Sequence, residues 1–372
     1  MDPRYLKLAD LLINFSCRLQ KGEHILIESF DIPSEMTIAL VRAARKAGGH
    51  PHVAERSGRI MAALYEDAGE DNFKVWAEYD LERMKRMHAY LGMRGSYNVN
   101  ELSGVPDTQM QKQARLYGKP VHFEQRVNHT KWCVLRWPTS SMAQLANMNT
   151  EAFEEFYFRV CCLDYARMEH ASKALSKRMA ATDKVHIKGP GDTDLHFSIK
   201  GIPNVPCCGQ MNIPDGEVFT SPVRNSVNGV IHYNTPTLYN GVSFENIRLE
   251  FKDGKIVTCS SSLNNDRLQK VFDTDEGARY VGEFAIGFHP HILQPMKDIL
   301  FDEKIAGSIH FTPGRAYETA DNGNRSEIHW DLVLIQRPEY GGGTLSFDGE
   351  VIRKDGRFVV ADLDPLNPDK LA

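Results

Sequence analysis

The first half of the chain alternates between helix-like and strand-like patterns of apolar residues. From Pro3 to Leu19 the apolar side chains recur at intervals of three or four, which predicts a helix, and the apolar run His24–Glu28 predicts a buried strand. Further helices are predicted at residues 35–47, 59–68, 73–87, 106–117, 140–147, 150–163 and 165–181, and further strands at 51–54, 89–93 and 131–137. Because strands alternate with helices, we expect a doubly wound α/β domain with a mostly parallel sheet and right-handed crossovers.

The pattern changes near Asp183, where long helical periodicities give way to short strands and turn residues. The dipeptide Asp253-Gly254, for instance, predicts a tight hairpin turn between two strands. Strands are predicted at residues 185–188, 195–199, 218–220, 229–233, 247–251, 255–259, 307–311, 328–335, 344–347, 351–353 and 358–360, and helices at 274–280 and 292–300. We therefore expect residues 1–181 to form the α/β domain and residues 182–372 to form a mainly β (α+β) domain.

Composition narrows the class of protein. A length of 372 residues agrees with two domains, since single cores rarely grow beyond about 300 residues. The net charge of −5 does not suggest binding to nucleic acid or to an anionic membrane. No apolar run is long enough to span a bilayer, and the first residues lack a signal-peptide layout. The seven cysteines include two adjacent pairs and do not suggest a disulfide framework, so we expect a reduced, cytoplasmic protein.

Several well-known catalytic motifs are absent from the sequence. No GxGxxG follows a predicted strand and no GxxxxGK[ST] occurs, so the doubly wound pattern does not by itself indicate nucleotide binding. The HExxH motif of thermolysin-like helices and the GxSxG motif of serine hydrolases are also missing. Candidate chemistry is instead concentrated in the second half of the chain.

The most informative pair is His329 and Asp331, separated by one residue in the phrase SEIHWDLV. If residues 328–332 form a strand, alternation puts both side chains on one face and the three apolar residues around them on the other. Two ligands side by side on a rigid strand would hold a metal ion with little rearrangement. A strand with a merely polar outer face is the alternative interpretation.

Glu217, Glu283 and His310 extend this set, and each lies close to a glycine in the sequence. Carboxylates and neutral imidazoles are the ligands that suit divalent metals of intermediate softness. With His329 and Asp331, the set offers three carboxylates and two imidazoles. The sequence therefore predicts a metal site, and zinc, cobalt and manganese all suit its ligands.

Five phrases in this part of the chain are PDGEVFTSP, GEFAIG, FDEKIAGSIHF, GRAY and SEIHWDLV. They resemble those of the aminopeptidase T and aminopeptidase S family, the M29 metallopeptidases, and the resemblance is strongest between about residues 183 and 334. It implies that Glu217, Glu283, His310, His329 and Asp331 bind a pair of divalent metals, with Tyr317 in the same site. One departure is a short segment between Tyr317 and His329, which bears on substrate preference and dimer contacts.

The resemblance also implies a function. We expect a cytoplasmic, homodimeric, metal-dependent aminopeptidase that removes N-terminal residues from short peptides. Glu217, Glu283 and Tyr317 are the predicted catalytic residues. The Tyr317 phenol is placed either to donate a hydrogen bond to the oxyanion of the reaction or to pack as an aromatic over the site. The sequence does not identify the general base: Glu217, Glu283 and a metal-bound hydroxide acting alone all remain open.

Two other functions remain compatible with the residues. His310, His329 and Asp331 alone would form the triad of a mononuclear non-haem Fe(II) ring-cleaving dioxygenase. Glu217 and Glu283 favour the peptidase, because a one-metal dioxygenase has little need of them. A metal-free binding module is the second alternative, and it would leave several converging carboxylates without compensation.

Three further groups of polar residues in this part of the chain are not predicted to be metal ligands. Glu303-Lys304 is expected to form an ion pair or a helix end rather than to supply ligands. Glu327 is a candidate partner behind the ligands, because strand alternation would place it on the face of His329. His289 and His291 flank a proline and are expected to lie in a loop.

Overall fold

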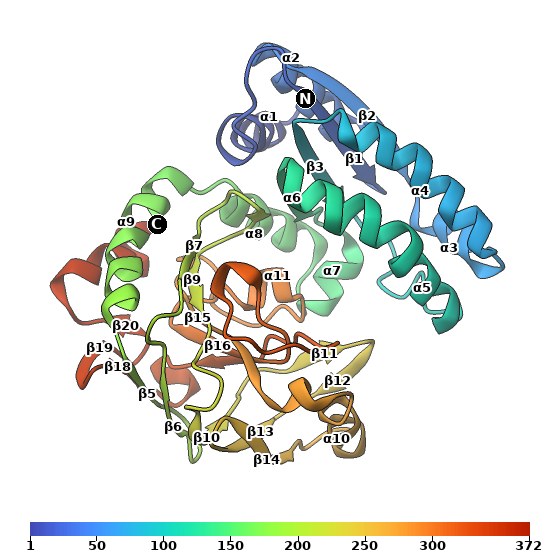
Figure 1. Cartoon of the computed structure of the whole chain (residues 1–372). Coiled ribbons are helices and arrows are strands. Elements are labelled where there is room, and N and C mark those ends of the chain that lie inside the picture. Colours follow the sequence, from blue (N-terminus) through green and yellow to red (C-terminus); the bar gives the residue numbers. More distant parts are fainter. The chain divides into compact units, whose positions relative to one another are not determined.

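The computed structural model describes residues 1–372, and the chain divides into two compact units (Figure 1). The first unit comprises Met1–Cys162 and the short segment Gly209–Ile213. The second comprises Leu163–Cys208 and Pro214–Ala372. By its contacts, helix α9 (Tyr165–Ala181) belongs to the second unit, whereas the boundary at 181/182 assigns it to the first domain.

The first unit is built on a parallel sheet with the strand order β2-β1-β3-β4-β8. Its strands are β1 (His24–Phe30), β2 (His50–Arg56), β3 (Ala89–Arg94), β4 (Lys131–Arg136) and β8 (Asn212–Ile213). The four strands predicted in this half of the chain are confirmed. Strands β1 and β3 are buried along almost their whole length, as expected for central strands of a parallel sheet that is covered on both faces, whereas the edge strand β2 is largely exposed.

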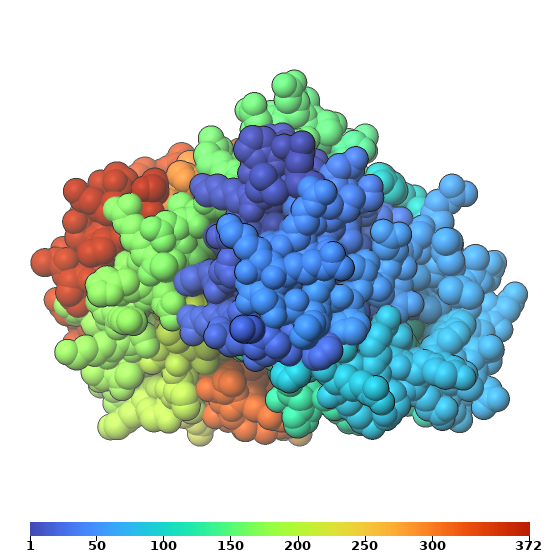
Figure 2. Space-filling model, turned by 90° about the horizontal axis from the view of Figure 1, so that it is seen from above, coloured from blue at the N-terminus to red at the C-terminus, as the bar shows by residue number.

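Helices connect these strands. They are α1 (Pro3–Asp10), α2 (Ser34–Lys46), α3 (Gly58–Glu66), α4 (Glu70–Lys85), α5 (Asp107–Gln113), α6 (Val127–His129), α7 (Ser140–Leu145) and α8 (Thr150–Cys161), with π-helical segments at Leu11–Ser16 and Ala114–Arg126. Helix α2 shows why they form: Met36, Leu40 and Ala44 recur every four residues and are all buried. Figure 2 shows the N-terminal residues, in dark blue, on the surface.

The second unit contains two antiparallel sheets and a two-stranded ribbon, β11-β12. The larger sheet has the order β14-β13-β10-β6-β5-β18-β19-β20, and the smaller one has the order β17-β16-β15-β9-β7. The strands are β5 (Lys184–Lys188), β6 (Asp194–Ser198), β7 (Val205–Cys207), β9 (Glu217–Thr220), β10 (Asn228–His232), β11 (Thr237–Tyr239), β12 (Val242–Phe244), β13 (Arg248–Lys252), β14 (Lys255–Ser260), β15 (Val281–Gly287), β16 (Ser308–Pro313), β17 (Val333–Ile335), β18 (Thr344–Phe347), β19 (Glu350–Lys354) and β20 (Arg357–Phe358). The predicted fold class, a doubly wound α/β part followed by a mainly β part, is confirmed.

The two sheets of the second unit pack against each other through aromatic side chains. The ring of Phe197 in β6 lies 5.0 Å from the rings of Phe284 in β15 and Phe311 in β16, measured between centroids. Because neighbouring residues of a strand point to opposite faces, the residues next to Phe284 and Phe311 point away from this core. The outer face of the smaller sheet is therefore where β15 and β16 can present polar groups.

The hairpin between β13 and β14 follows its sequence signal. Asp253 and Gly254 have φ angles of 50° and 86°, the left-handed values that a two-residue turn between twisted strands requires. The glycine is needed for a second reason, since a Cβ on Gly254 would lie 2.0 Å from the carbonyl oxygen of Arg224.

Helices of the second unit depart from the predictions. Besides α9, they are α10 (Asn265–Phe272), α11 (Ile299–Asp302) and α12 (Pro368–Leu371). The helix predicted at 274–280 is wrong, because only the short 3-10 turn Glu276–Arg279 forms there. The helix predicted at 292–300 is also wrong apart from its last residues, since Pro295 interrupts the pattern. No helix in the structure combines the length and the apolar character needed to span a membrane.

Candidate metal centre

Three neighbouring strands of the smaller sheet carry polar residues to its outer face. Glu217 opens β9, Glu283 lies in β15 and His310 lies in β16. All three side chains are buried, with exposed fractions of 5%, 4% and 0%. Since the flanking Phe284 and Phe311 pack toward the other sheet, alternation brings the carboxylates and the imidazole together on the opposite face.

A glycine allows the chain to pack closely beside Glu283. A Cβ on Gly282 would lie 2.2 Å from the carbonyl oxygen of Arg315, so no other residue fits there. At the same place the pairing of β15 with β16 shifts register, which is typical of a bulge that redirects a side chain. The backbone around Arg315 can therefore lie directly against the strand that holds Glu283.

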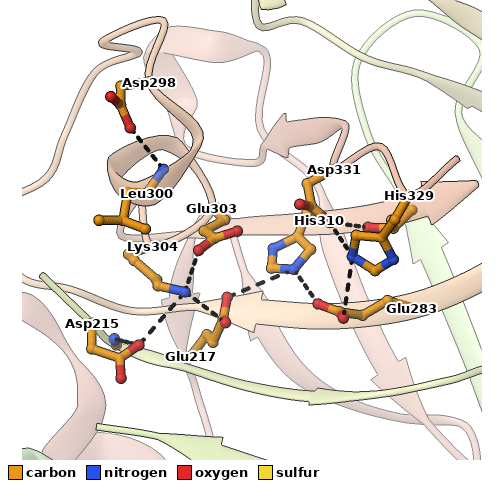
Figure 3. Close-up of polar contacts among 12 residues, drawn as sticks. Asp215, Glu217, Glu283, Asp298, Leu300, Glu303, Lys304, His310, His329 and Asp331 are labelled. Atoms are coloured by element: carbon orange, nitrogen blue, oxygen red, sulfur yellow. Dashed lines mark hydrogen bonds and ion pairs between the residues drawn. The ribbon is translucent and has the colours of Figure 1, made fainter. Parts of the chain in front are cut away.

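The five residues predicted as metal ligands lie together (Figure 3). His310 Nε2 is 2.8 Å from Glu283 Oε1 and 3.6 Å from Glu217 Oε2. His329 Nε2 is 3.3 Å from Asp331 Oδ1 and 3.8 Å from Glu283 Oε2. Glu283 thus lies between the two imidazoles, and each of its oxygens faces one of them.

His329 and Asp331 are neighbours although the strand predicted at 328–335 is wrong over most of its length. Only β17 is a regular strand, and His329 forms an isolated bridge with Gly314. The alternation of an extended chain nevertheless holds, because the apolar side chains of Ile328, Trp330 and Leu332 are buried. The backbone N–H of Trp330 donates a hydrogen bond of 3.1 Å to the carbonyl oxygen of Pro313, which holds this irregular segment against the end of β16.

Two further hydrogen bonds orient these ligands. His329 Nδ1 is 2.8 Å from the carbonyl oxygen of Arg315, which accepts the proton of that nitrogen and leaves Nε2 facing the cluster. The hydroxyl of Thr312 donates to Asp331 Oδ1 over 2.7 Å. Such outer partners fix the ring tautomer and the carboxylate rotamer that metal binding needs.

Several atoms of the cluster are buried without a hydrogen bond. They are Glu217 Oε2, Glu283 Oε2 and His310 Nδ1. A buried carboxylate oxygen that accepts no hydrogen bond is costly. A cation between these oxygens removes that cost, so the residues fit a metal on structural grounds. Ligand atoms of Glu217, Glu283 and His310 lie within 4.8 Å of one another, and so do those of Glu283, His329 and Asp331.

The electrostatics of the cluster also favour cations. Burial opposes the charged form of His310, but the carboxylates of Glu217 and Glu283 outweigh it and raise the pKa of His310 to about 9. Burial likewise opposes the charged form of His329, whereas Asp331 raises its pKa to about 10. Burial raises the pKa of Glu217 to about 8, against the opposing effect of nearby positive charge. In the metal-free protein, the imidazoles and carboxylates that would bind a metal ion therefore hold protons tightly.

A lysine in the cluster was not predicted. Lys304 is 1% exposed, and its Nζ lies 2.6 Å from Glu217 Oε1, 2.6 Å from Glu303 Oε1 and 3.5 Å from Asp215 Oδ1. Burial works against its charge, but the three carboxylates raise the pKa of Lys304 well above its usual value. It is therefore a fixed cation at one end of the site, and only the phrase FDEKIAG could have drawn attention to it.

Glu303 has more than one contact. It forms the expected ion pair with Lys304 and directly follows helix α11. It also belongs to a third group of potential ligands, because its carboxylate lies within 4.8 Å of ligand atoms of His310 and Asp331. Burial raises the pKa of Glu303, and the negative charge of Asp331 raises it further. The positive charge of Lys304 opposes both effects without cancelling them. The sequence-based interpretation of Glu303-Lys304 was therefore incomplete.

Tyr317 lies at the edge of the cluster. Its ring centroid is 4.6 Å from that of His329, and half of its surface is exposed. Desolvation, together with the negative charge of Glu283 and Asp331, raises the pKa of Tyr317 well above its usual value. The phenol is therefore protonated at neutral pH and is able to donate a hydrogen bond beside the ligands.

Three other candidates lie outside the ligand groups. Glu327 is exposed, and its backbone N–H donates to Asp275 Oδ2 over 2.7 Å. His289 is fully buried and forms a single bridge with Ile305, and His291 follows in an irregular segment. None of the three belongs to a group with converging ligand atoms in the smaller sheet.

A buried cluster of carboxylates and imidazoles supplies the ligand types of a divalent metal centre. Comparison with known proteins defines the class further. Residues 1–358 match the family described as thermophilic metalloprotease (M29), and the chain belongs to this family. The predicted family is therefore confirmed, and the protein is an enzyme of the metallopeptidase class that depends on a divalent metal and acts on peptides.

Several relatives are named as aminopeptidases, and two of the three described here match most of the chain. Aminopeptidase T of Thermus thermophilus is 27% identical over 405 residues, which cover 95% of this chain and 98% of that protein. Aminopeptidase AmpS of Bacillus subtilis is 24% identical and covers 87% of each chain. Aminopeptidase 2 of Geobacillus stearothermophilus is 35% identical over 164 residues, or 39% of this chain and 37% of that one.

Two solved structures share the fold. Wild-type AmpT from Thermus thermophilus matches with a TM-score of 0.80 and 23% identity, covering 96% of this chain and 99% of that chain. The 2,5-dihydroxypyridine dioxygenase from Pseudomonas putida KT2440 matches with a TM-score of 0.63 and 12% identity, covering 97% and 98%. At these identities both likenesses concern the fold alone.

Proposed function

We propose that this protein is an aminopeptidase with a dinuclear metal site, which releases N-terminal residues from short peptides. The position of Glu283 carries the proposal. Its two oxygens face His310 and His329 separately, and it is shared by two groups of three potential ligands. A carboxylate placed in this way can bridge two ions.

In this arrangement Glu217, Glu283 and His310 would hold one ion, and Glu283, His329 and Asp331 the other. Zinc, cobalt and manganese all suit these ligands. When bound, the ions supply Lewis-acid polarisation of the scissile carbonyl and a nucleophile derived from water at neutral pH. The protein supplies the remaining contributions: orientation of the ligands by Arg315 and Thr312, and burial that excludes bulk water.

Tyr317 is the proposed hydrogen-bond donor to the substrate. Its phenol stays protonated beside the ligands, and half of its surface is open to an entering molecule. As the peptide carbonyl is attacked, negative charge develops on its oxygen, and a donor already in place stabilises that charge more than the neutral carbonyl. The Tyr317 hydroxyl would donate this hydrogen bond without transferring its proton.

The charge of the site suits a substrate with a free amine. Five carboxylates lie in the cluster, namely those of Asp215, Glu217, Glu283, Glu303 and Asp331. Lys304 and two bound divalent ions would balance these five negative charges, so the loaded site would carry no net positive charge to repel the ammonium group at the N-terminus of a peptide. Glu217 and Glu283 are both candidates to accept the proton of the attacking water.

We also propose that the enzyme is a homodimer in the cytoplasm. All seven cysteines are free thiols, and six of them are buried, which agrees with a reducing compartment. The homodimer is inferred from the family resemblance. Light scattering of the purified protein would test it directly, and a monomeric mass across micromolar concentrations would contradict it.

A mononuclear ring-cleaving dioxygenase is the weaker alternative. His310, His329 and Asp331 could serve as its triad, and the fold is shared with such an enzyme. The buried Glu217 and Glu283 oxygens that accept no hydrogen bond are the observation against it, because one ion bound to the triad would leave them uncompensated.

The test is reconstitution of the metal-free protein. Protein stripped with a chelator and dialysed is assayed for hydrolysis of leucyl-p-nitroanilide and a panel of other aminoacyl anilides. We expect no activity without metal, recovery with zinc, cobalt or manganese, and saturation near two ions per chain in the cluster. Absence of metal-dependent hydrolysis of every aminoacyl substrate would contradict the proposed function.

A further inference from the structure

A second group of potential metal ligands lies on the larger sheet of the second unit. His186 belongs to β5, and Asp194 and His196 belong to β6. The two strands are antiparallel, and their register places His186 directly opposite His196. Alternation puts Asp194 on the same face as His196, two residues away. All three side chains are partly open to solvent, with exposed fractions of 30%, 54% and 59% for His186, Asp194 and His196.

The two imidazoles converge on one oxygen. His186 Nε2 lies 2.8 Å and His196 Nε2 lies 3.0 Å from the same atom, Asp194 Oδ1. The rings are nearly parallel, with centroids 3.8 Å apart and an angle of 19° between their planes. Potential ligand atoms of the three residues all lie within 4.8 Å of one another.

This geometry is close to what a small divalent ion requires. A tetrahedral zinc ion with Zn–N bonds of about 2.0–2.1 Å holds two nitrogens about 3.3 Å apart, so the two Nε2 atoms that share Asp194 Oδ1 could bind one ion once the stacked rings rotate apart. The register of the two strands fixes the backbone positions of the three residues. Space for the ion would therefore have to come from rotation of the side chains. Lys188 lies nearby, but its Nζ is 3.9 Å from the other carboxylate oxygen, Asp194 Oδ2.

We propose that His186, Asp194 and His196 form an additional site for a divalent ion of the zinc, copper or nickel type. Two imidazoles and one carboxylate select such ions over magnesium or calcium. Because the residues are partly exposed, water would complete the coordination and the ion would exchange readily. The site is separate from the cluster of the smaller sheet and does not depend on the proposed peptidase reaction.

The ion would join two strands at the middle of an eight-stranded sheet. Strands β6 and β5 are the fourth and fifth in its order, so the link lies between the two halves of the sheet. The three ligands come together only in the folded chain. Binding of the ion therefore stabilises the folded state by an amount that grows with the concentration of free ion.

The experiment compares the zinc content of the full-length protein with that of a His186→Asn/His196→Asn variant after dialysis against the same zinc buffer. His170→Asn, which alters an exposed histidine of helix α9 outside the ligand groups, is the matched control. We expect one zinc ion fewer per chain in the double variant and unchanged content in the control. We also expect zinc to raise the Tm of the double variant less than that of the other two proteins.

Equal zinc content and an equal rise in Tm in all three proteins would overturn the proposal. Hydrolysis of aminoacyl substrates should be the same in all three, since no residue of the catalytic cluster is changed. The converse variant, Glu283→Gln, should still bind the ion at His186 and His196. If the double variant fails to fold, His196→Asn alone serves, because this is the most exposed of the three ligands.

Discussion

Each unit buries a glutamate, but only the glutamate of the first unit has both carboxylate oxygens hydrogen-bonded. In the first unit Glu28 is 2% exposed, and both of its oxygens accept hydrogen bonds: Oε2 from the Tyr90 hydroxyl at 2.7 Å and Oε1 from Arg56 at 3.2 Å. In the second unit Glu283 is 4% exposed, but its Oε2 accepts no hydrogen bond.

The difference distinguishes a structural carboxylate from a proposed metal ligand. A buried carboxylate whose charge and lone pairs are matched by the protein needs nothing else. A carboxylate with an oxygen left open, facing other acids and imidazoles, is stable only when a proton or a cation is added. Burial alone would not distinguish Glu28 from Glu283, whereas the count of donors around each oxygen does.

The largest expected effect is on metal binding. We expect Glu283→Gln to lower the metal content by at least one ion per chain and kcat/KM by more than about 100-fold, because loss of a ligand should exceed the 10–100-fold cost of losing an outer partner. Glu28→Gln is the matched control and should keep the full metal content. Elemental analysis and steady-state kinetics measure both, and equal metal content in the two variants would break the comparison.

The tyrosines provide the next contrast. Tyr317→Phe should lower kcat by about 10²–10³-fold at unchanged metal content, since one donor to the developing charge is lost. Tyr90→Phe removes a hydroxyl that donates to Glu28 and should leave kcat unchanged per folded molecule. A normal kcat in the Tyr317→Phe enzyme would show that the hydroxyl is not needed and that Tyr317 only packs over the site.

Stability should respond in the opposite order. Glu28→Gln weakens the hydrogen bonds from Arg56 and Tyr90 to a buried carboxylate, and we expect it to lower the free energy of unfolding by about 2 kcal/mol. Glu283→Gln, measured in metal-free protein, should cost less, because it removes a charge from a crowded group of acids. Urea unfolding of both metal-free variants measures this free energy. A larger loss for Glu283→Gln than for Glu28→Gln would contradict the assignment of Glu28 as the structural carboxylate.

The smallest expected effect is a pH dependence confined to metal-free protein. The pKa values of His310 and His329 are raised from 6.5 to about 9 and about 10 in the folded state. A raised pKa means that the folded state binds the proton more tightly, so this stability is fully present below pH 6.5 and is lost as the pH rises through 9 and 10. The Tm of metal-free protein should therefore fall between pH 7 and 10 more than that of metal-loaded protein. Parallel curves would show that protons and metal do not share these atoms.

Much of the fold could be predicted because the signals are local. The central strands β1 and β3 contain continuous apolar runs, and Asp253-Gly254 specifies its own turn. Helix α10 was missed because its sequence, NDRLQKVF, buries only Leu268 and Phe272. A pattern with two buried positions does not stand out from the polar loops of a mainly β region.

The site was predictable in its residue types but not in its connections. His329 and Asp331 share a face by alternation alone, even without a regular strand. Lys304 could not be assigned from its neighbours, because its partner Glu217 is 87 residues away in sequence and meets it only through the sheet. Long-range contacts of this kind depend on strand order, which apolar periodicity does not encode.

The buried ammonium group of Lys304 has a consequence for the metal-free state of the enzyme. Its bonds to Glu217 and Glu303 do not involve a metal. When ions are withdrawn, this permanent charge still restrains those acids against mutual repulsion. The residues of the cluster should thus keep their arrangement without metal and bind new ions without refolding, which would let the enzyme survive metal starvation and regain activity when metal returns.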